Sequence, residues 1–149
     1  MNYQIIQLLE QHHIKPTAMR ILVLQQLRTA QKHLSLSDIE AALYPADRIT
    51  IYRTLQTFVR KGIAHTLDTL HSGVVYGLCA DNCTDEKHND EHPHFLCEKC
   101  KTITCIDDFS YSIRENSTAA KDYKIHKIEV TIKGVCPNCV SKSKDRENL

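Results

Sequence analysis

Residues 48–79 read RITIYRTLQTFVRKGIAHTLDTLHSGVVYGLC, and they decide the fold of the first half of the chain. The stretch opens with a predicted helix from about Arg48 to Lys61, and the following Gly62 suits the left-handed backbone at a helix C-terminus. The apolar side of this helix repeats at helical spacing and consists of Ile51, Leu55, Phe58 and Val59. The period then shortens, so that residues 63–67 and 74–79 predict the two strands of a hairpin. A helix followed by such a hairpin is typical of a winged helix-turn-helix.

The residues before this stretch supply the other helices of the same domain. A first helix is expected to end before Pro16, which cannot continue it. Thr17 is a candidate N-cap for a second helix. Ser37, with Glu40 three residues later, predicts a capping box that opens a short third helix. We therefore predict an N-terminal winged-helix DNA-binding domain over residues 1–80.

A second domain follows a polar connection. Residues 81–92 contain no aliphatic side chain and are rich in Asp, Asn and Glu, which predicts a linker. Residues 93–140 predict a small α/β domain, with strands near 95–97, 102–106 and 124–133 and a helix over 109–121. The charged tail, residues 141–149, is predicted to be disordered. The expected fold class is α+β: a winged helix-turn-helix followed by a small α/β domain.

The composition places the chain among globular, water-soluble proteins. It has 149 residues, 42% of them hydrophobic and 25% charged, and a formal net charge of +1. No apolar run approaches the roughly 20 residues that span a bilayer, and the first residues lack a signal-peptide profile, so we expect a cytoplasmic protein without a membrane partner. Thiols stay reduced in the cytoplasm, so the seven cysteines are better explained as metal or redox groups than as disulfides.

One face of the predicted helix has the side chains of a DNA-reading surface. Tyr52, Gln56 and Arg60 recur every four residues, with Arg53 beside them. Arg contacts phosphate or guanine, Gln contacts adenine, and a Tyr ring packs on a thymine methyl group. A plain solvated face is the alternative, but the position of the helix before a wing favours DNA contact. The net charge of residues 1–80, +3, has the matching sign.

Two Cys-x-x-Cys pairs predict a metal site in the second domain. Cys97 and Cys100 form the first pair, and Cys136 and Cys139 form the second. Four thiolates complete the tetrahedron that Zn²⁺ prefers and leave no position for substrate, so the site is expected to be structural rather than catalytic. A thiol–disulfide switch built from the same pairs is the alternative.

The remaining metal-binding side chains suggest a second, regulatory site. The candidates are His65 and Cys79 on the predicted wing, and His92, His94 and Cys105 in the second half. A metal with ligands from both domains would fix their relative orientation, and only one orientation of two reading helices fits two DNA half-sites. A mixture of Cys and His ligands favours Zn²⁺, whereas carboxylate-rich sites suit Mn²⁺ or Fe²⁺.

Five motifs, taken together, resemble the ferric uptake regulator family of bacterial metal-responsive repressors over about residues 5–140. They are His33-Leu34-Ser35-x-x-Asp38-Ile39, Thr50-Ile51-Tyr52-Arg53-Thr54-Leu55, Gly62-Ile63, His92-x-His94-x-x-Cys97-x-x-Cys100 and Gly134-Val135-Cys136-x-x-Cys139. The resemblance implies that the α/β domain is a dimerisation domain and that a homodimer binds A·T-rich inverted repeats of double-stranded DNA. It also implies that Lys15 enters the minor groove, that Tyr52 and Arg53 contact DNA, and that Arg20 contacts a phosphate.

Within the family, the chain is most similar to the zinc-uptake regulators, because Cys79 stands in a Tyr-x-Leu-Cys context. We therefore expect a repressor of zinc-uptake genes that holds a structural and a regulatory Zn²⁺ in each subunit and has no small-molecule substrate. The resemblance makes His33 a ligand in some iron- or manganese-sensing members, but here it is expected to be structural. Cys83 and His88 stay open as auxiliary ligands.

Two other functions are weighed against a zinc-sensing repressor. One is an iron- or peroxide-sensing regulator of the same family, which the thiol at Cys79 disfavours. The other is a zinc-dependent hydrolase that uses His92 and His94. No glutamate stands in a His-Glu-x-x-His arrangement with them, so we expect the protein not to be an enzyme.

Overall fold

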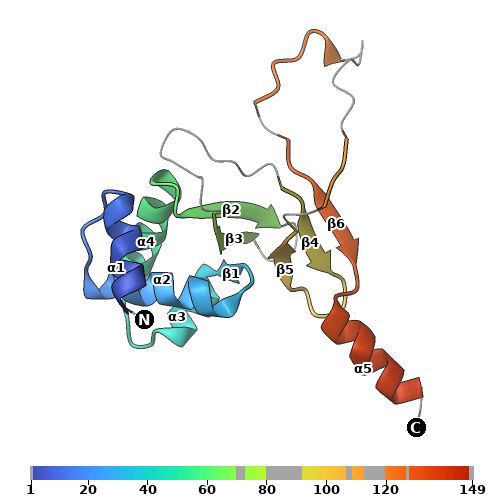
Figure 1. The fold of residues 1–149 in the computed structure, drawn as a ribbon, viewed down its shortest axis with the longest axis horizontal. Helices are drawn as coiled ribbons and strands as arrows, with labels where there is room; N and C mark the ends of the chain where they lie inside the picture. The colour runs from blue at the N-terminus through green and yellow to red at the C-terminus, as the bar shows by residue number, and fades with distance from the viewer. Residues whose placement is uncertain are drawn as a thin grey trace. The chain divides into compact units, whose positions relative to one another are not determined.

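The computed structural model describes residues 2–69, 73–79, 92–106, 109–112, 120–126 and 128–147. The chain divides into two compact units, Met1–Asp90 (unit 1) and Glu91–Leu149 (unit 2). Each unit has its own three-stranded sheet (Figure 1). The linker predicted over residues 81–92 falls almost entirely outside the described residues, and so do Cys83 and His88.

Unit 1 has the order of elements of a winged helix-turn-helix. The elements are α1 (Asn2–Gln11), α2 (Ala18–Ala30), β1 (Leu34–Ser35), α3 (Leu36–Ala42), α4 (Arg48–Arg60), β2 (Ala64–Thr69) and β3 (Gly73–Leu78). The buried apolar faces of the helices meet in one core, which includes Leu9, Leu24, Ile39, Leu55 and Phe58. The antiparallel sheet has the order β1-β3-β2, so β2 and β3 form the wing that directly follows α4 (Figure 1).

Side-chain caps fix where the helices of unit 1 begin. Thr17 caps α2, as predicted, and Asp47 caps α4 by accepting from the amide of Thr50 at 2.8 Å. The capping box predicted at Ser37 and Glu40 is wrong, because α3 begins two residues earlier. Its N-cap is Ser35, whose hydroxyl accepts from the amide of Asp38 at 3.1 Å. The reason is β1, which pairs with β3 and brings the chain into the helix directly after Ser35.

Unit 2 is a small sheet followed by a helix. Strands β4 (His94–Cys97), β5 (Ile103–Cys105) and β6 (Thr131–Gly134) have the order β5-β4-β6, and α5 covers Pro137–Glu147. Strand β4 is antiparallel to β5 and parallel to β6. The strand predicted over 124–133 is therefore shorter than expected, because β4 offers only four residues to pair with it.

Two other expectations for unit 2 fail among the described residues. Residues 109–112 are not helical, although a helix was predicted from 109; residues 113–119 lie outside the described part. The tail predicted to be disordered from Ser141 instead continues α5 to Glu147. Pro137 at the first helical position favours this helix, and the hydroxyl of Ser141 donates back to the carbonyl of Pro137 at 3.0 Å. The polar tail has no apolar periodicity from which a helix could be predicted, but its residues still have the intrinsic propensity to form one.

Candidate metal centres and nucleic-acid interface

Two backbone turns bring four cysteines together in unit 2. Cys97 ends β4, and Cys100 lies in the turn that follows. Lys101 closes that turn in the left-handed region, with φ 61°, while its amide donates to the carbonyl of Cys97 at 2.9 Å. Cys136 directly precedes α5 and Cys139 lies in its first turn. Each Cys-x-x-Cys pair is thus a turn that presents two sulfurs on the same side.

The spacing of the sulfurs fits one metal ion. The four Sγ atoms lie within 4.8 Å of one another, and those of Cys100 and Cys136 are 3.8 Å apart. A tetrahedral zinc with Zn–S bonds near 2.3 Å sets its sulfurs about 3.8 Å apart. The structure therefore brings together all four residues that the sequence predicted for this site. Four sulfur donors make a closed coordination shell, which suits a structural metal.

The protonation of the cluster also favours a cation. Backbone amides of Cys100 and Cys136 lower the pKa of Cys97 to about 6. The neighbouring thiol of Cys136, the largest cause, raises the pKa of Cys139 to about 12. Without a metal, one sulfur is therefore ready to bind while another stays protonated. Four thiolates at this spacing need a positive ion among them, and a bound metal supplies it.

Unit 1 contains a buried pair of histidines. The Nε2 atoms of His33 and His65 are 2.7 Å apart, and the two side chains are 7% and 2% exposed. His65 lies on β2, and His33 directly precedes β1, so β3 between these two strands brings them together. The sequence predicted His65 as a ligand and His33 as structural. The structure places His33 next to His65. This proximity depends on strand β1, which the sequence did not predict.

In unit 2, a histidine and a cysteine face each other across two strands. His94 on β4 is the register partner of Cys105 on β5, and His94 is 4% exposed. The ring of His92 lies beside that of His94, with centroids 5.0 Å apart. These three side chains were all predicted as ligands. The structure thus gathers one thiol and two imidazoles at the same end of β4.

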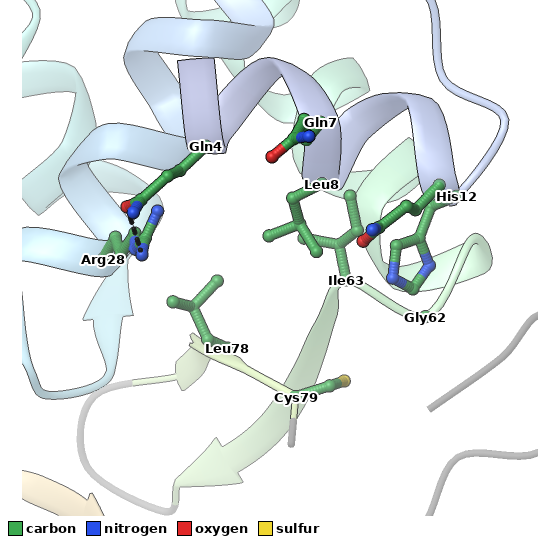
Figure 2. Close-up of a pocket in the computed structure, with 10 residues that line it drawn as sticks. Gln4, Gln7, Leu8, His12, Arg28, Gly62, Ile63, Leu78 and Cys79 are labelled. Carbon is green, nitrogen blue, oxygen red and sulfur yellow. Dashed lines mark hydrogen bonds between the residues drawn. The ribbon is translucent and has the colours of Figure 1, made fainter. Parts of the chain in front are cut away.

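Cys79 directly follows β3, where its amide donates to the carbonyl of Ile63 at 2.9 Å. It lines a pocket with a volume of about 410 Å³ below α1, together with Leu78, Ile63 and His12 (Figure 2). Arg28 and Gln4 lie on the opposite wall, where the guanidinium donates to the Gln4 carboxamide oxygen at 3.2 Å. Among the described residues, Cys79 belongs to no group of three metal-binding side chains. The hairpin pairs as predicted, with His65 opposite Gly77, so Cys79 lies two residues beyond the register partner of His65.

The predicted DNA-reading residues form an exposed face of α4. Arg53, Gln56 and Arg60 are exposed, and Tyr52 is 45% exposed. The side chain of Gln56 also hydrogen-bonds to the Tyr76 hydroxyl, which ties the face to the wing. Sequence reasoning missed Ile49, which is 60% exposed in the first turn of the helix. The signal was present, because Ile49 lies three residues before Tyr52 and hence on the same face.

The two basic residues expected near the start of α2 contact each other. The guanidinium of Arg20 donates to the backbone carbonyl of Lys15 at 2.8 Å, and the Lys15 side chain is exposed. Arg20 therefore fixes the loop that carries Lys15. By contrast, Arg48 on α4 forms an ion pair with Glu40 on α3 within unit 1.

Comparison with known proteins identifies the family. A sequence model of the ferric uptake regulator family matches residues 11–133. The ferric uptake regulation protein of Synechococcus elongatus is 32% identical over 131 residues, which cover 85% of this chain and 84% of that protein. The chain belongs to the ferric uptake regulator family. The regulator is thus metal-responsive and is not an enzyme, as its sequence predicted.

Solved structures of the family share the regulator's fold. The Vibrio cholerae ferric uptake regulator matches with a TM-score of 0.60 at 21% identity, over 88% of this chain and 98% of that chain. A zinc uptake regulator complexed with zinc and DNA matches with a TM-score of 0.63 at 19% identity, over 96% of this chain and 95% of that chain. These likenesses confirm the predicted α+β fold class. None of the described helices of the regulator is long and apolar enough to cross a membrane.

Proposed function

We propose that the regulator is a zinc-responsive transcriptional repressor that binds A·T-rich inverted repeats as a homodimer and controls zinc-uptake genes. The observation that carries this proposal is the chemistry of its donors. The four-cysteine cluster, the His33–His65 pair and the His94–Cys105 pair contain only nitrogen and sulfur. Such donors favour Zn²⁺ over the iron and manganese that carboxylate-rich sites prefer.

The four-cysteine cluster is proposed to hold a structural Zn²⁺. Cys97, Cys100, Cys136 and Cys139 join the end of β4 to the start of α5, segments that are 36 residues or more apart in sequence. A metal bound by these four side chains stabilises unit 2 directly, because unfolded chain offers no comparable site. The closed sulfur shell keeps this site out of sensing.

A second set of side chains is proposed to hold the regulatory metal. His65, together with His33, would supply imidazole ligands from unit 1, and His94 with Cys105 would supply ligands from unit 2. His92 and Cys79 are the further candidates, and Cys105, the register partner of His94, is the favoured thiolate. Ligands from both units would fix their mutual orientation, which two half-sites of one operator require.

The same proposal assigns the DNA-binding surface. Tyr52, Arg53, Gln56 and Arg60 on α4 would enter the major groove, while Lys15 and Arg20 would contact the minor groove and a phosphate. Support comes from the exposure of this face of α4 and from the net charge of +3 over residues 1–80. The large apolar side chains exposed in unit 2 support a homodimer, because burying them against a second copy is favourable. They include Tyr123, Ile125, Ile128 and Val140.

A second candidate function is iron sensing. It is favoured by the relative with 32% identity, which is a ferric uptake regulation protein. The sulfur donor of Cys105 argues against it, since Fe²⁺ sites in proteins are usually built from nitrogen and oxygen.

Co²⁺ substitution tests the regulatory site. The four-cysteine site is first filled with zinc, and one equivalent of Co²⁺ is then added. Cobalt bound at the second site should give a sulfur-to-metal charge-transfer band. The band should disappear in Cys105→Ser and persist in Cys79→Ser, and only the former should lose metal-dependent DNA binding. Loss of the band in Cys79→Ser alone would reassign the thiolate. Cobalt binding at the second site without such a band, together with activation of DNA binding by Fe²⁺ and not by Zn²⁺, would favour the iron sensor.

A further inference from the structure

Gly77 is a buried glycine that the backbone does not require. It lies inside β3, where glycine weakens a strand because it loses more conformational freedom than other residues. The glycines with positive φ are Gly62 and Gly73, so Gly77 is not needed for a left-handed conformation. The explanation for a glycine at position 77 must therefore lie in the space beside its Cα atom.

That space is occupied by the imidazole of His33. A Cβ atom added at Gly77 would overlap Nε2 of His33 and lie 2.7 Å from Cδ2 and 2.9 Å from Cε1 of the same ring. Gly77 is also the register partner of His65 across the β2–β3 hairpin. Gly77 on β3 therefore lies between β2, which carries His65, and β1, which His33 directly precedes, at the place where the two rings meet.

The ring of His33 has little freedom to avoid such a Cβ atom. His33 directly precedes β1, whose Leu34 pairs with Tyr76 on β3, next to Gly77. The following residue, Ser35, caps α3 through its capping box with Asp38. The backbone on the C-terminal side of the ring is thus held by a strand pair and a helix cap, and the ring itself is 7% exposed.

We propose that Gly77 is a positioning residue of the regulatory metal centre: its missing side chain leaves the room in which His33 and His65 converge. This inference rests on the proposed function of His65 as a ligand. In a tetrahedral zinc site with Zn–N bonds near 2.0–2.1 Å, two imidazole nitrogens are about 3.3 Å apart. The observed Nε2–Nε2 distance of 2.7 Å needs only a small separation to reach it. A side chain at position 77 displaces the His33 ring and ends this convergence.

The test measures zinc affinity in full-length protein whose four-cysteine site is already filled, by competition with a chromogenic chelator. Gly77→Ala should weaken the binding of the second zinc on the order of 10–100-fold, the effect typical of residues that orient metal ligands. Gly73→Ala is the matched control in the same hairpin. It strains the backbone at φ 68°, but its Cβ meets no atom within 4 Å, so zinc affinity should stay within about twofold of the parent protein.

A double substitution separates a clash with His33 from a general loss of stability. In the His33→Ala background no ring lies beside position 77, so adding Gly77→Ala should not weaken zinc binding further. If Gly77→Ala alone fails to fold, the double variant should fold, because the clash is gone. Equal weakening by Gly77→Ala in both backgrounds, or a double variant that also fails to fold, would overturn the inference.

His65→Ala distinguishes failure of this inference from failure of the proposed function. If His65→Ala loses the second zinc while Gly77→Ala binds it normally, only the role of Gly77 is wrong. If His65→Ala keeps the second zinc at full affinity, the proposed regulatory centre is wrong, and the inference on Gly77 is overturned with it.

Discussion

Replacing one sulfur of the four-cysteine cluster should unfold unit 2 and leave unit 1 intact. Cys136→Ser removes a thiolate at the junction with α5 and replaces it with a hydroxyl, a poor zinc ligand at neutral pH. The amide of Cys136 also donates to the sulfur of Cys97 at 3.3 Å, so the substitution lies at the point where the two turns meet. We expect loss of the metal and, with it, loss of the sheet–helix arrangement of unit 2.

The magnitude follows from how little else holds unit 2 together. Among its described residues, the buried apolar side chains are Pro93, Cys97 and Ile103. Full burial of a side chain as large as Ile contributes about 1.5–3 kcal/mol, so these three together supply at most about 9 kcal/mol. A structural zinc contributes roughly 10 kcal/mol or more to a small metal-organised unit. Unit 1, by contrast, has a core that includes Leu9, Leu24 and Phe58.

The assay combines elemental analysis with limited proteolysis and thermal unfolding. Cys136→Ser should lose one tightly bound metal per chain, and a protease should then cleave unit 2 rapidly while unit 1 keeps its cooperative transition. Cys79→Ser is the control, because it removes a thiol from unit 1 and leaves the cluster whole. Full metal content and parental protease resistance of unit 2 in Cys136→Ser would show that the four-cysteine cluster does not hold unit 2 together through a metal.

Three further predictions concern other parts of the molecule. Arg53→Ala should weaken operator binding by roughly 1–3 kcal/mol without changing metal content, and equal affinity would mean that the α4 face does not read DNA. Ser35→Ala should lower the free energy of unfolding of unit 1 by about 1 kcal/mol through loss of the α3 cap. Because the hydroxyl of Ser35 lowers the pKa of Asp38, this effect should be full above the ordinary carboxyl pKa of 3.8 and shrink as the pH falls below it. Finally, zinc binding to the cluster at pH 8 should release at least one proton but fewer than four, since the pKa is about 6 for Cys97 and about 12 for Cys139. Calorimetry in buffers of different ionisation enthalpy counts the released protons. Release of four or more would contradict these pKa values.

The sequence predicted the winged helix well because its signals are local. Each of these signals acts within a few residues: the apolar spacing along α4, the cap at Thr17 and the glycine after α4. The structure confirms all three. The four cysteines were equally readable, because two residues between sulfurs are enough for one turn to present both. In both cases the chemistry is carried by neighbours in the chain.

The rest depended on pairing between distant segments. Strand β1 is two residues long and forms only through its pairing with β3, so the sequence contains no alternating pattern that could predict it. Without it, the start of α3 was placed at Ser37 instead of Ser35, and His33 was not connected with His65. The same limit applies to β6, whose length is set by its partner β4 rather than by its own alternating pattern.

Control of DNA binding by the second zinc is tested most directly by measuring operator affinity as a function of free zinc. A fluorescently labelled A·T-rich inverted repeat, selected in vitro with this protein, is titrated with protein whose four-cysteine site is filled, in zinc buffers that span occupation of the second site. We predict that operator affinity rises as the second zinc binds, with the same midpoint as zinc binding itself. Equal operator affinity with the second site empty and filled would show that zinc does not control DNA binding.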